Sequence, residues 1–297
     1  MTRVDPQHRR GALAALVTAG LLWGLTVPLS KVALEWLDPA WLAFARFGSA
    51  APVLLLVARH AVRASASGPV VLWGVVGFGA VVLLQNAGIA RTSVTHAALI
   101  VGAVPALVAA VAIVRGRSTT GPLARAGFAV ALGGVALVAG SGGEASLAGD
   151  GLMLASAFLG ALFIDAQSRL LVGRDPVAVT AVQMGAAALV LLPVALAFEP
   201  LPVSAPAGGA ALAALALVTF GSLLPFALYA KAQSRVPAEF AGAFVNVEPL
   251  VGAAIGALVF QDPFGAGQAL GAAAIVGGIL LSVAPPRVRR RGRPCLA

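Results

Sequence analysis

The chain has 297 residues, of which 60% are hydrophobic and only 10% are charged. Soluble domains usually carry about 25% charged residues, so this composition excludes an ordinary soluble protein. The formal net charge of +9 does not indicate a nucleic-acid partner, because the basic residues lie between apolar runs and in the C-terminal tail rather than on one amphipathic face.

Apolar runs of roughly 20 residues, each long enough for a helix that crosses a bilayer, follow one another along the chain. Their hydrophobicity is continuous rather than alternating, which favours helices over barrel strands. Asp-Pro, Gly-Pro and Gly-rich turn signals separate them. The sequence therefore predicts an all-α polytopic membrane protein with ten transmembrane helices, at 11–31, 39–58, 69–89, 94–114, 122–140, 150–170, 176–197, 207–230, 238–260 and 266–284.

Lysine and arginine predict the orientation of these helices, because cytoplasmic segments are enriched in both. With the N-terminus in the cytoplasm, 17 of the 20 basic residues fall on the inner side, two fall outside, and Arg46 falls within a helix. We therefore expect a multi-pass protein of the cell inner membrane with cytoplasmic N- and C-termini. The outer loops are expected to hold the acids Glu35, Asp38, Glu144, Asp150, Glu199 and Asp262.

The two halves of the chain resemble each other. Residues 91–137 align without gaps on 235–281, so that Pro105 matches Pro249 and Gly134 matches Gly278. Each half holds five expected helices, and an odd number forces the two copies to cross the membrane in opposite directions. Inverted repeats of this kind are typical of secondary transporters, whose site lies near the midplane. The expected organisation is a first five-helix repeat, an outer connecting loop, a second five-helix repeat and a basic cytoplasmic tail, at 1–140, 141–149, 150–284 and 285–297.

Several motifs are similar to those of the EamA-type drug/metabolite transporters. They are LLWGLTVPLSK at 21–31, ARF at 45–47, VEPL at 247–250 and the glycine-rich closing helix of each half. The resemblance implies a ten-helix inverted fold that exports small metabolites, often amino acids or related solutes. Family members commonly carry Gly-Glu after the fourth and ninth helices, where this chain instead has RGR at 115–117 and Gln261-Asp262.

Glu248 is the only charge in the apolar run from Phe240 to Phe260, and Pro249 follows it directly. An isolated carboxylate is costly at that depth, so Glu248 must be either paired or protonated. Pro249 removes a backbone donor and frees a carbonyl, and Pro105 does the same in the other repeat. Two interpretations stay open: Glu248 contacts a substrate ammonium or carries a coupling proton, or it forms a structural contact that fixes helix packing.

Other polar and aromatic residues within the spans are further candidates for the substrate site. Arg46 either pairs with Glu248, holds a substrate carboxylate, or clamps neighbouring carbonyls. Trp23 lies mid-helix, away from the interface where tryptophan is usual, and either stacks on a substrate or packs in the core. Thr26 lies three residues after Trp23, on the same face of the helix. Its hydroxyl either contacts a ligand or donates to a carbonyl of its own helix. His96, Asp165 and Tyr229 lie near the ends of spans. They either line two vestibules or are ordinary residues of the membrane interface.

The sequence contains no phosphate-binding GxxxxGK[ST] loop, no HExxH and no GxSxG motif, and Cys295 is its single cysteine. It therefore predicts no cofactor and no metal site. An intramembrane enzyme built on Glu248, Asp165 or His96 would need paired acids or histidines at helical spacing. A non-transporting membrane sensor would need a soluble domain to signal through. A secondary transporter is favoured over both, with a small-molecule substrate and membrane lipids as its expected partners. Coupling to protons stays open as one of the alternatives for Glu248.

Overall fold

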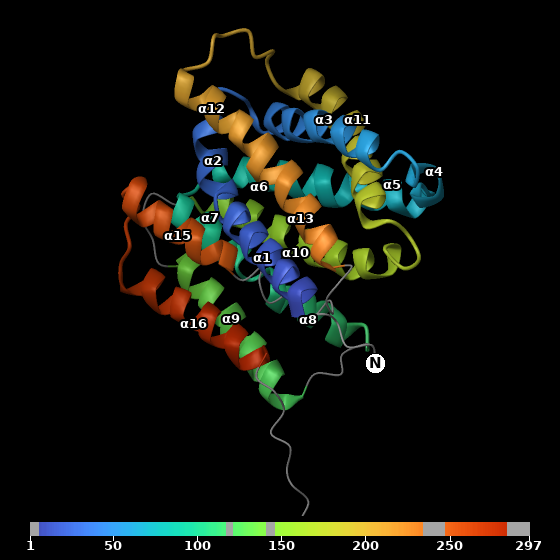
Figure 1. Cartoon of the computed structure of the whole chain (residues 1–297). Coiled ribbons are helices and arrows are strands. Elements are labelled where there is room, and N and C mark those ends of the chain that lie inside the picture. Colours follow the sequence, from blue (N-terminus) through green and yellow to red (C-terminus); the bar gives the residue numbers. More distant parts are fainter. Residues whose placement is uncertain (1–5, 117–120, 141–145, 234–246, 284–297) are drawn as a thin grey trace, which may run out of the picture.

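The computed structural model describes residues 6–116, 121–140, 146–233 and 247–283, and every element in these ranges is helical (Figure 1). The first half of the chain forms α1 (Pro6–Gly24), α2 (Thr26–Ala33), α3 (Pro39–Val57), α4 (Val62–Ser65), α5 (Gly68–Gly74), η1 (Val75–Ala80), α6 (Val81–Ile89), α7 (Val94–Val101), α8 (Val104–Val114) and α9 (Pro122–Gly140). The second half forms α10 (Leu147–Leu170), α11 (Pro176–Phe198), α12 (Gly208–Ala216), η2 (Leu217–Leu223), α13 (Leu224–Gln233), α15 (Val247–Val259) and α16 (Ala266–Val283).

The helices identify a multi-pass membrane protein. Seven helical runs are long and apolar enough to cross a bilayer: Ala14–Ala33, Pro39–Val57, Gly68–Ile89, Val94–Val111, Leu147–Gln167, Pro176–Phe198 and Gly208–Tyr229. Three shorter apolar helices lie within the expected fifth, ninth and tenth spans, at Arg125–Gly140, Glu248–Val259 and Ala266–Gly278. The start of the ninth expected span, at 238–246, and the basic tail lie outside the described residues.

Two of these runs are broken near prolines. Leu25 separates α1 from α2 just before Pro28, and Gly102 and Ala103 separate α7 from α8 just before Pro105. Proline has no backbone N–H, so each removes one hydrogen bond from the preceding turn. The expected single helix at 11–31 is therefore two helices.

Two other runs contain a wider, π-helical turn at matching places in the two halves. Phe78 and Gly79 lie in η1, and their repeat partners Phe220 and Gly221 lie in η2. Such turns open the regular hydrogen-bond ladder and are frequent at functional sites.

The start of α3 is capped by a residue from the other half of the chain. Glu199, directly after α11, accepts hydrogen bonds from the backbone N–H groups of Ala40 (2.8 Å) and Trp41 (3.0 Å). Asp38, the residue at the N-cap position itself, makes no side-chain cap bond. An anion is favourable at a helix N-terminus, so Glu199 ties α11 to α3.

Helices of the two halves pack in pairs. The most extensive contacts join α9 to α16, α3 to α11, α6 to α10, α7 to α15 and α1 to α13. In Figure 1, α9 and α16 run side by side. A Cβ added to Gly134 would lie 2.6 Å from the Gly271 carbonyl oxygen, and one added to Gly278 would meet the Gly127 carbonyl. Residues later in α9 contact residues earlier in α16, so the two helices are antiparallel. Their backbones are in direct contact at these glycines.

Gly278 and its neighbour Gly277 provide a matched test of this contact. A Cβ on Gly278 would lie 2.6 Å from the backbone nitrogen of Ala131, whereas one on Gly277 would enter open space. We expect Gly278→Ala to reduce stability by about 1–3 kcal/mol, because the helices must separate. Gly277→Ala should leave the melting temperature of the purified protein unchanged or slightly raised. Equal melting temperatures for the two variants would contradict the close approach of α9 and α16.

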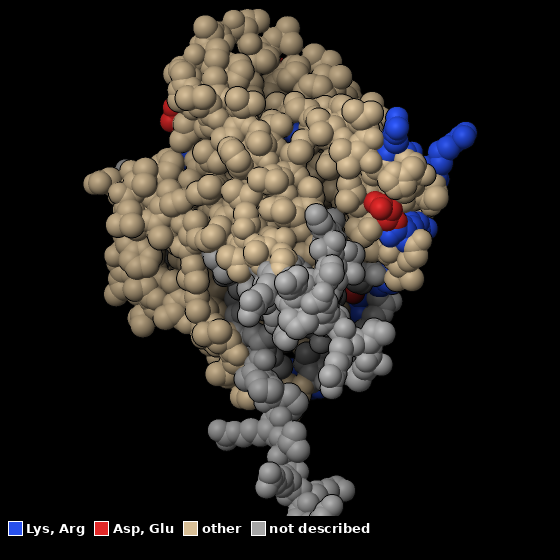
Figure 2. All heavy atoms as spheres, viewed as in Figure 1, with Lys and Arg blue, Asp and Glu red and all other residues tan. Residues whose placement is uncertain are grey.

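The surface suits contact with lipid. Of the described residues seen in Figure 2, nearly all are uncharged, and most of the blue Lys and Arg atoms are gathered at the side where α4 and α5 lie in Figure 1. Large apolar side chains point outward, including Leu56, Leu72, Leu189 and Leu258. In water such a surface would cause aggregation, whereas in a bilayer it faces hydrocarbon.

Candidate functional site

Trp23 takes part in a row of aromatic rings between the halves. Its ring centroid lies 5.1 Å from that of Phe226 and 5.1 Å from that of Tyr229, both on α13. Phe226 in turn lies 5.2 Å from Phe78, in an edge-on arrangement. Aromatic pairs at these distances favour edge-to-face geometry. The row therefore joins α1 and η1 of the first half to α13 of the second.

Glu248 lies beside α1, next to this row. A Cβ on Gly24 would come within 2.5 Å of the Val251 Cβ and 3.1 Å of the Glu248 backbone oxygen. Only glycine allows α1 to approach α15 so closely. Gly24 follows Trp23 directly, so the aromatic row and the first turn of the described part of α15 are neighbours. The Glu248 side chain is half-buried there.

Arg46 is a buried cation on α3, held by η2. Its Nε donates to Ser222 Oγ at 3.2 Å, and one terminal nitrogen lies 3.5 Å from the Gly221 carbonyl oxygen. The guanidinium also lies 5.6 Å from the centroid of the Phe47 ring. Gly221 brings Arg46 close to Thr26, and the Glu248 backbone packs on Gly24, two residues before Thr26 in the chain. A base of the first half and an acid of the second therefore both lie near the break between α1 and α2.

Thr26 completes this group, which we call the central cluster: Trp23, Thr26, Arg46, Gly221, Ser222, Phe226, Tyr229 and Glu248. A Cβ on Gly221 would lie 3.1 Å from Thr26 Cγ2 and 3.7 Å from Arg46. The Thr26 hydroxyl donates to the Trp23 carbonyl at 2.6 Å, across the break between α1 and α2. That bond fixes the side chain and places its methyl group toward η2.

Pro249 packs on the break between α7 and α8. A Cβ on Gly102 would come within 2.8 Å of the Pro249 Cβ. Further along, Gly252 faces Ala98. Pro105 follows the same break and starts α8. Pro249 therefore lies against the break that precedes its repeat partner Pro105, and next to Glu248 in the chain.

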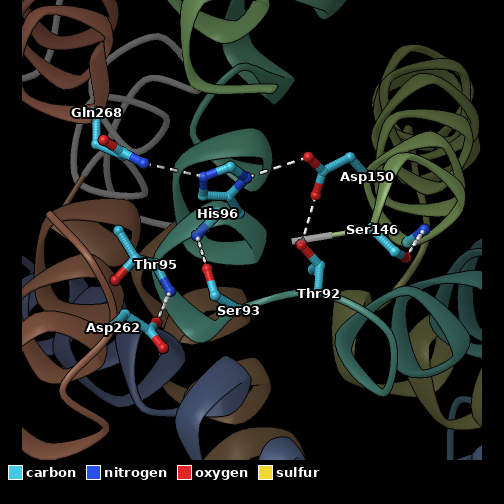
Figure 3. A network of polar contacts seen from close by, with 9 residues as sticks. Thr92, Ser93, Thr95, His96, Ser146, Asp150, Asp262 and Gln268 are labelled. Atoms are coloured by element: carbon cyan, nitrogen blue, oxygen red, sulfur yellow. Dashed lines mark hydrogen bonds and ion pairs between the residues drawn. The ribbon is translucent and has the colours of Figure 1, made fainter. Parts of the chain in front are cut away.

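His96 and Asp165 lie apart from the central cluster. His96 belongs to a buried polar network at the start of α7, shown in Figure 3. Asp165 pairs with Arg115 at the end of α8 and with Arg169 at 3.2 Å on its own helix. Of the sequence candidates, the structure brings together Trp23, Thr26, Arg46, Tyr229, Glu248 and Pro249.

Other polar residues were not expected in their observed roles. Asp150, expected in an outer loop, lies inside α10 and is buried, because Thr92 and His96 supply hydrogen bonds to it. Gln183, the repeat partner of Arg46, exchanges two amide hydrogen bonds with Gln167, of 2.7 and 3.0 Å. Within the described ranges, no group of three or more His, Cys, Asp or Glu side chains could hold a metal ion.

Comparison with known proteins agrees with this architecture. A model of the EamA-like transporter family matches residues 9–140 and again residues 147–284. Thirteen chains of solved structures match, and one crystal structure aligns with a TM-score of 0.68 at 20% identity. That alignment covers 92% of this chain and 96% of the other. No curated protein matches the sequence.

Proposed function

Because this chain belongs to the EamA-like transporter family, in two consecutive repeats, we propose that it is a secondary transporter that exports a small metabolite across the inner membrane by alternating access. The family is one of membrane transporters of small solutes. The exported solute is an amino acid or a related compound, and the substrate site is the central cluster.

The observation that carries this proposal is that Arg46 and Glu248, a base and an acid from opposite halves of the chain, both lie near the break between α1 and α2. Charged residues at such positions are costly and are usually retained for function. A guanidinium suits a substrate carboxylate, and a carboxylate suits a substrate ammonium. The rings of Trp23 and Tyr229 supply an apolar wall and a cation-binding face beside them. Alternatively, Glu248 takes a coupling proton when the substrate leaves.

The reciprocal contacts of α9 and α16 support an inverted repeat. Gly134 and Gly127 are the repeat partners of Gly278 and Gly271. The contact of Gly134 with Gly271 therefore has its counterpart in that of Gly278 with Gly127. A pair of equivalent contacts between antiparallel helices is what a two-fold axis perpendicular to those helices produces. In a membrane such an axis lies in the membrane plane, as alternating access between inverted five-helix repeats requires.

The orientation can be tested with reporter fusions. We expect ten spans with both termini in the cytoplasm, because the basic residues then fall inside. A topology reporter fused after Gly143 or after Glu199 should be active outside, and one fused after Arg63 should be active inside. Finding positions 63 and 143 on the same side of the membrane would contradict this topology.

The transported solute can be found by thermal stabilisation. A ligand that binds only the folded protein at about a hundred times its Kd stabilises it by about 2.7 kcal/mol. We expect at least one amino acid or related solute in a metabolite panel to raise the melting temperature. The same solute should exchange across the membrane of liposomes that contain the protein and not across protein-free liposomes. A stabilising solute that never crosses the membrane would favour a binding protein or sensor instead.

A further inference from the structure

A buried polar network links the two halves of the chain at one end of the bundle, away from the central cluster. Thr92 precedes α7, His96 lies in its first turn, Asp150 lies near the start of α10, and Gln268 lies near the start of α16 (Figure 3). Their exposed fractions are only 2%, 2%, 3% and 3%, so all four side chains are inside the protein.

Both carboxylate oxygens of Asp150 have a side-chain partner in the network. Thr92 Oγ1 donates to one carboxylate oxygen at 2.5 Å, and His96 Nδ1 lies 3.1 Å from the other. Gln268 Nε2 lies 3.4 Å from His96 Nε2. Since the Gln268 oxygen accepts from the Gly265 N–H at 3.0 Å, its amide nitrogen must face His96. His96 therefore accepts at Nε2 and donates from Nδ1 to Asp150.

The contacts that join these four side chains to one another all cross between the halves. Thr92 and His96 belong to the first half, and Asp150 and Gln268 belong to the second. A neighbouring contact does the same, because Asp262 accepts a hydrogen bond from the Thr95 backbone N–H at 2.7 Å. Lys31 at the end of α2 donates to the Thr92 carbonyl at 2.8 Å. The start of α7 is thus fastened to α2, α10, α16 and the α15–α16 connection.

The opposite end of the bundle is held differently. There Asp165 is paired with Arg115 and Arg169, whose side chains are 36% and 49% exposed. Exposed ion pairs are weakened by water and salt and contribute little to stability. Hydrogen bonds to a buried carboxylate are stronger, and breaking one without admitting water is costly. The buried network is therefore the firmer of these two connections.

We propose that Thr92, His96, Asp150 and Gln268 form an outer latch that closes the outer side of the transport path and must open for release. The latch rests on the proposed transport function and topology, which place the start of α7 on the outer side. Its polar character suits a reversible closure, because water can replace each hydrogen bond when the halves separate. An apolar contact of the same size has no such compensation.

Cysteine labelling from outside the cell tests the latch without requiring a known substrate. The single native cysteine is replaced by Cys295→Ser, and Thr26→Cys reports on the path. Thr26 lies five residues before Lys31, about 7.5 Å deeper along the helix. The probe is a membrane-impermeant maleimide added to intact cells. We expect Asp150→Asn to raise the labelling rate of the cysteine introduced at position 26 by about tenfold. This corresponds to a loss of about 1.4 kcal/mol in the free energy that favours the closed state over the open one.

Two further variants make the result decisive. Asp38→Asn removes an exposed outer carboxylate that makes no cap bond, and it should leave the labelling rate unchanged. Thr92→Val removes one donor to Asp150 with little change in shape, and it should raise labelling even if Asp150→Asn fails to fold. Unchanged labelling in every folded latch variant would overturn the latch. If labelling rises but the unaltered protein, without the cysteine at position 26, transports no solute in liposomes, the proposed function is refuted, and only the closing contact of the four side chains is supported.

Discussion

Glu248→Gln should reduce transport by about tenfold or more, which corresponds to a loss of about 1.4 kcal/mol in the rate-limiting barrier. Glutamine keeps the shape of glutamate but can neither carry a negative charge nor take up a coupling proton. Since Glu248 lies against Gly24, next to Trp23 in the proposed substrate site, either role would be lost. The measurement is the initial rate of solute exchange in liposomes containing equal amounts of folded protein.

Folding must be shown to survive this change. Yield and melting temperature of Glu248→Gln should stay close to those of the unaltered protein, and Glu35→Gln, at an exposed site, should transport normally. If Glu248 only makes a structural contact, Glu248→Gln should transport at nearly the normal rate. Glu248→Leu should then lower the melting temperature before it lowers transport by the protein that remains folded. That pattern would remove Glu248 from the substrate site.

Arg46→Met should reduce the free energy of unfolding by about 1–3 kcal/mol, because it deprives the buried Ser222 hydroxyl and the Gly221 carbonyl of their hydrogen-bond donor. Methionine roughly preserves the length of the side chain, so the loss reports on charge and hydrogen bonding. The measurement is the melting temperature in detergent, together with the folded yield by size-exclusion chromatography.

The double variant separates charge from packing. Combining Arg46→Met with Glu248→Gln removes both charges, so the pair should be less destabilised than the sum of the single changes. Groups that interact show coupling energies of about 0.5–3 kcal/mol in such cycles. Strict additivity would mean that Arg46 and Glu248 do not interact in the folded protein.

The helical architecture was largely predictable from the sequence, because long apolar runs and proline turns determine it. Pro39 and Pro176 start α3 and α11 as expected. The π-helical turns were not predictable, since the apolar runs that contain η1 and η2 continue without a signal. Asp150 was wrongly expected in a loop, because a lone charge at the edge of an apolar run indicates a boundary. Its partners Thr92 and His96 come from a distant segment.

The central cluster was only partly visible in the sequence. Glu248 and Arg46 stand out as charges within apolar runs, and the repeat draws attention to Pro105 and Pro249. Gly221 and Ser222 gave no such signal, because small residues are common throughout membrane helices. Their role depends on η2, whose wider turn presents a carbonyl and a hydroxyl to Arg46. Only the three-dimensional arrangement of α3 and η2 reveals that contact.

Whether Arg46 and Glu248 form the substrate site is tested most directly by ligand-induced stabilisation of the unaltered protein and three variants. The solute that raises the melting temperature of the unaltered protein is added to Glu248→Gln and to Arg46→Met, each measured with and without it. We expect the stabilisation to fall sharply or vanish in both variants, while Glu35→Gln keeps it in full. Equal stabilisation of all the proteins would contradict the assignment and place the solute elsewhere in the protein.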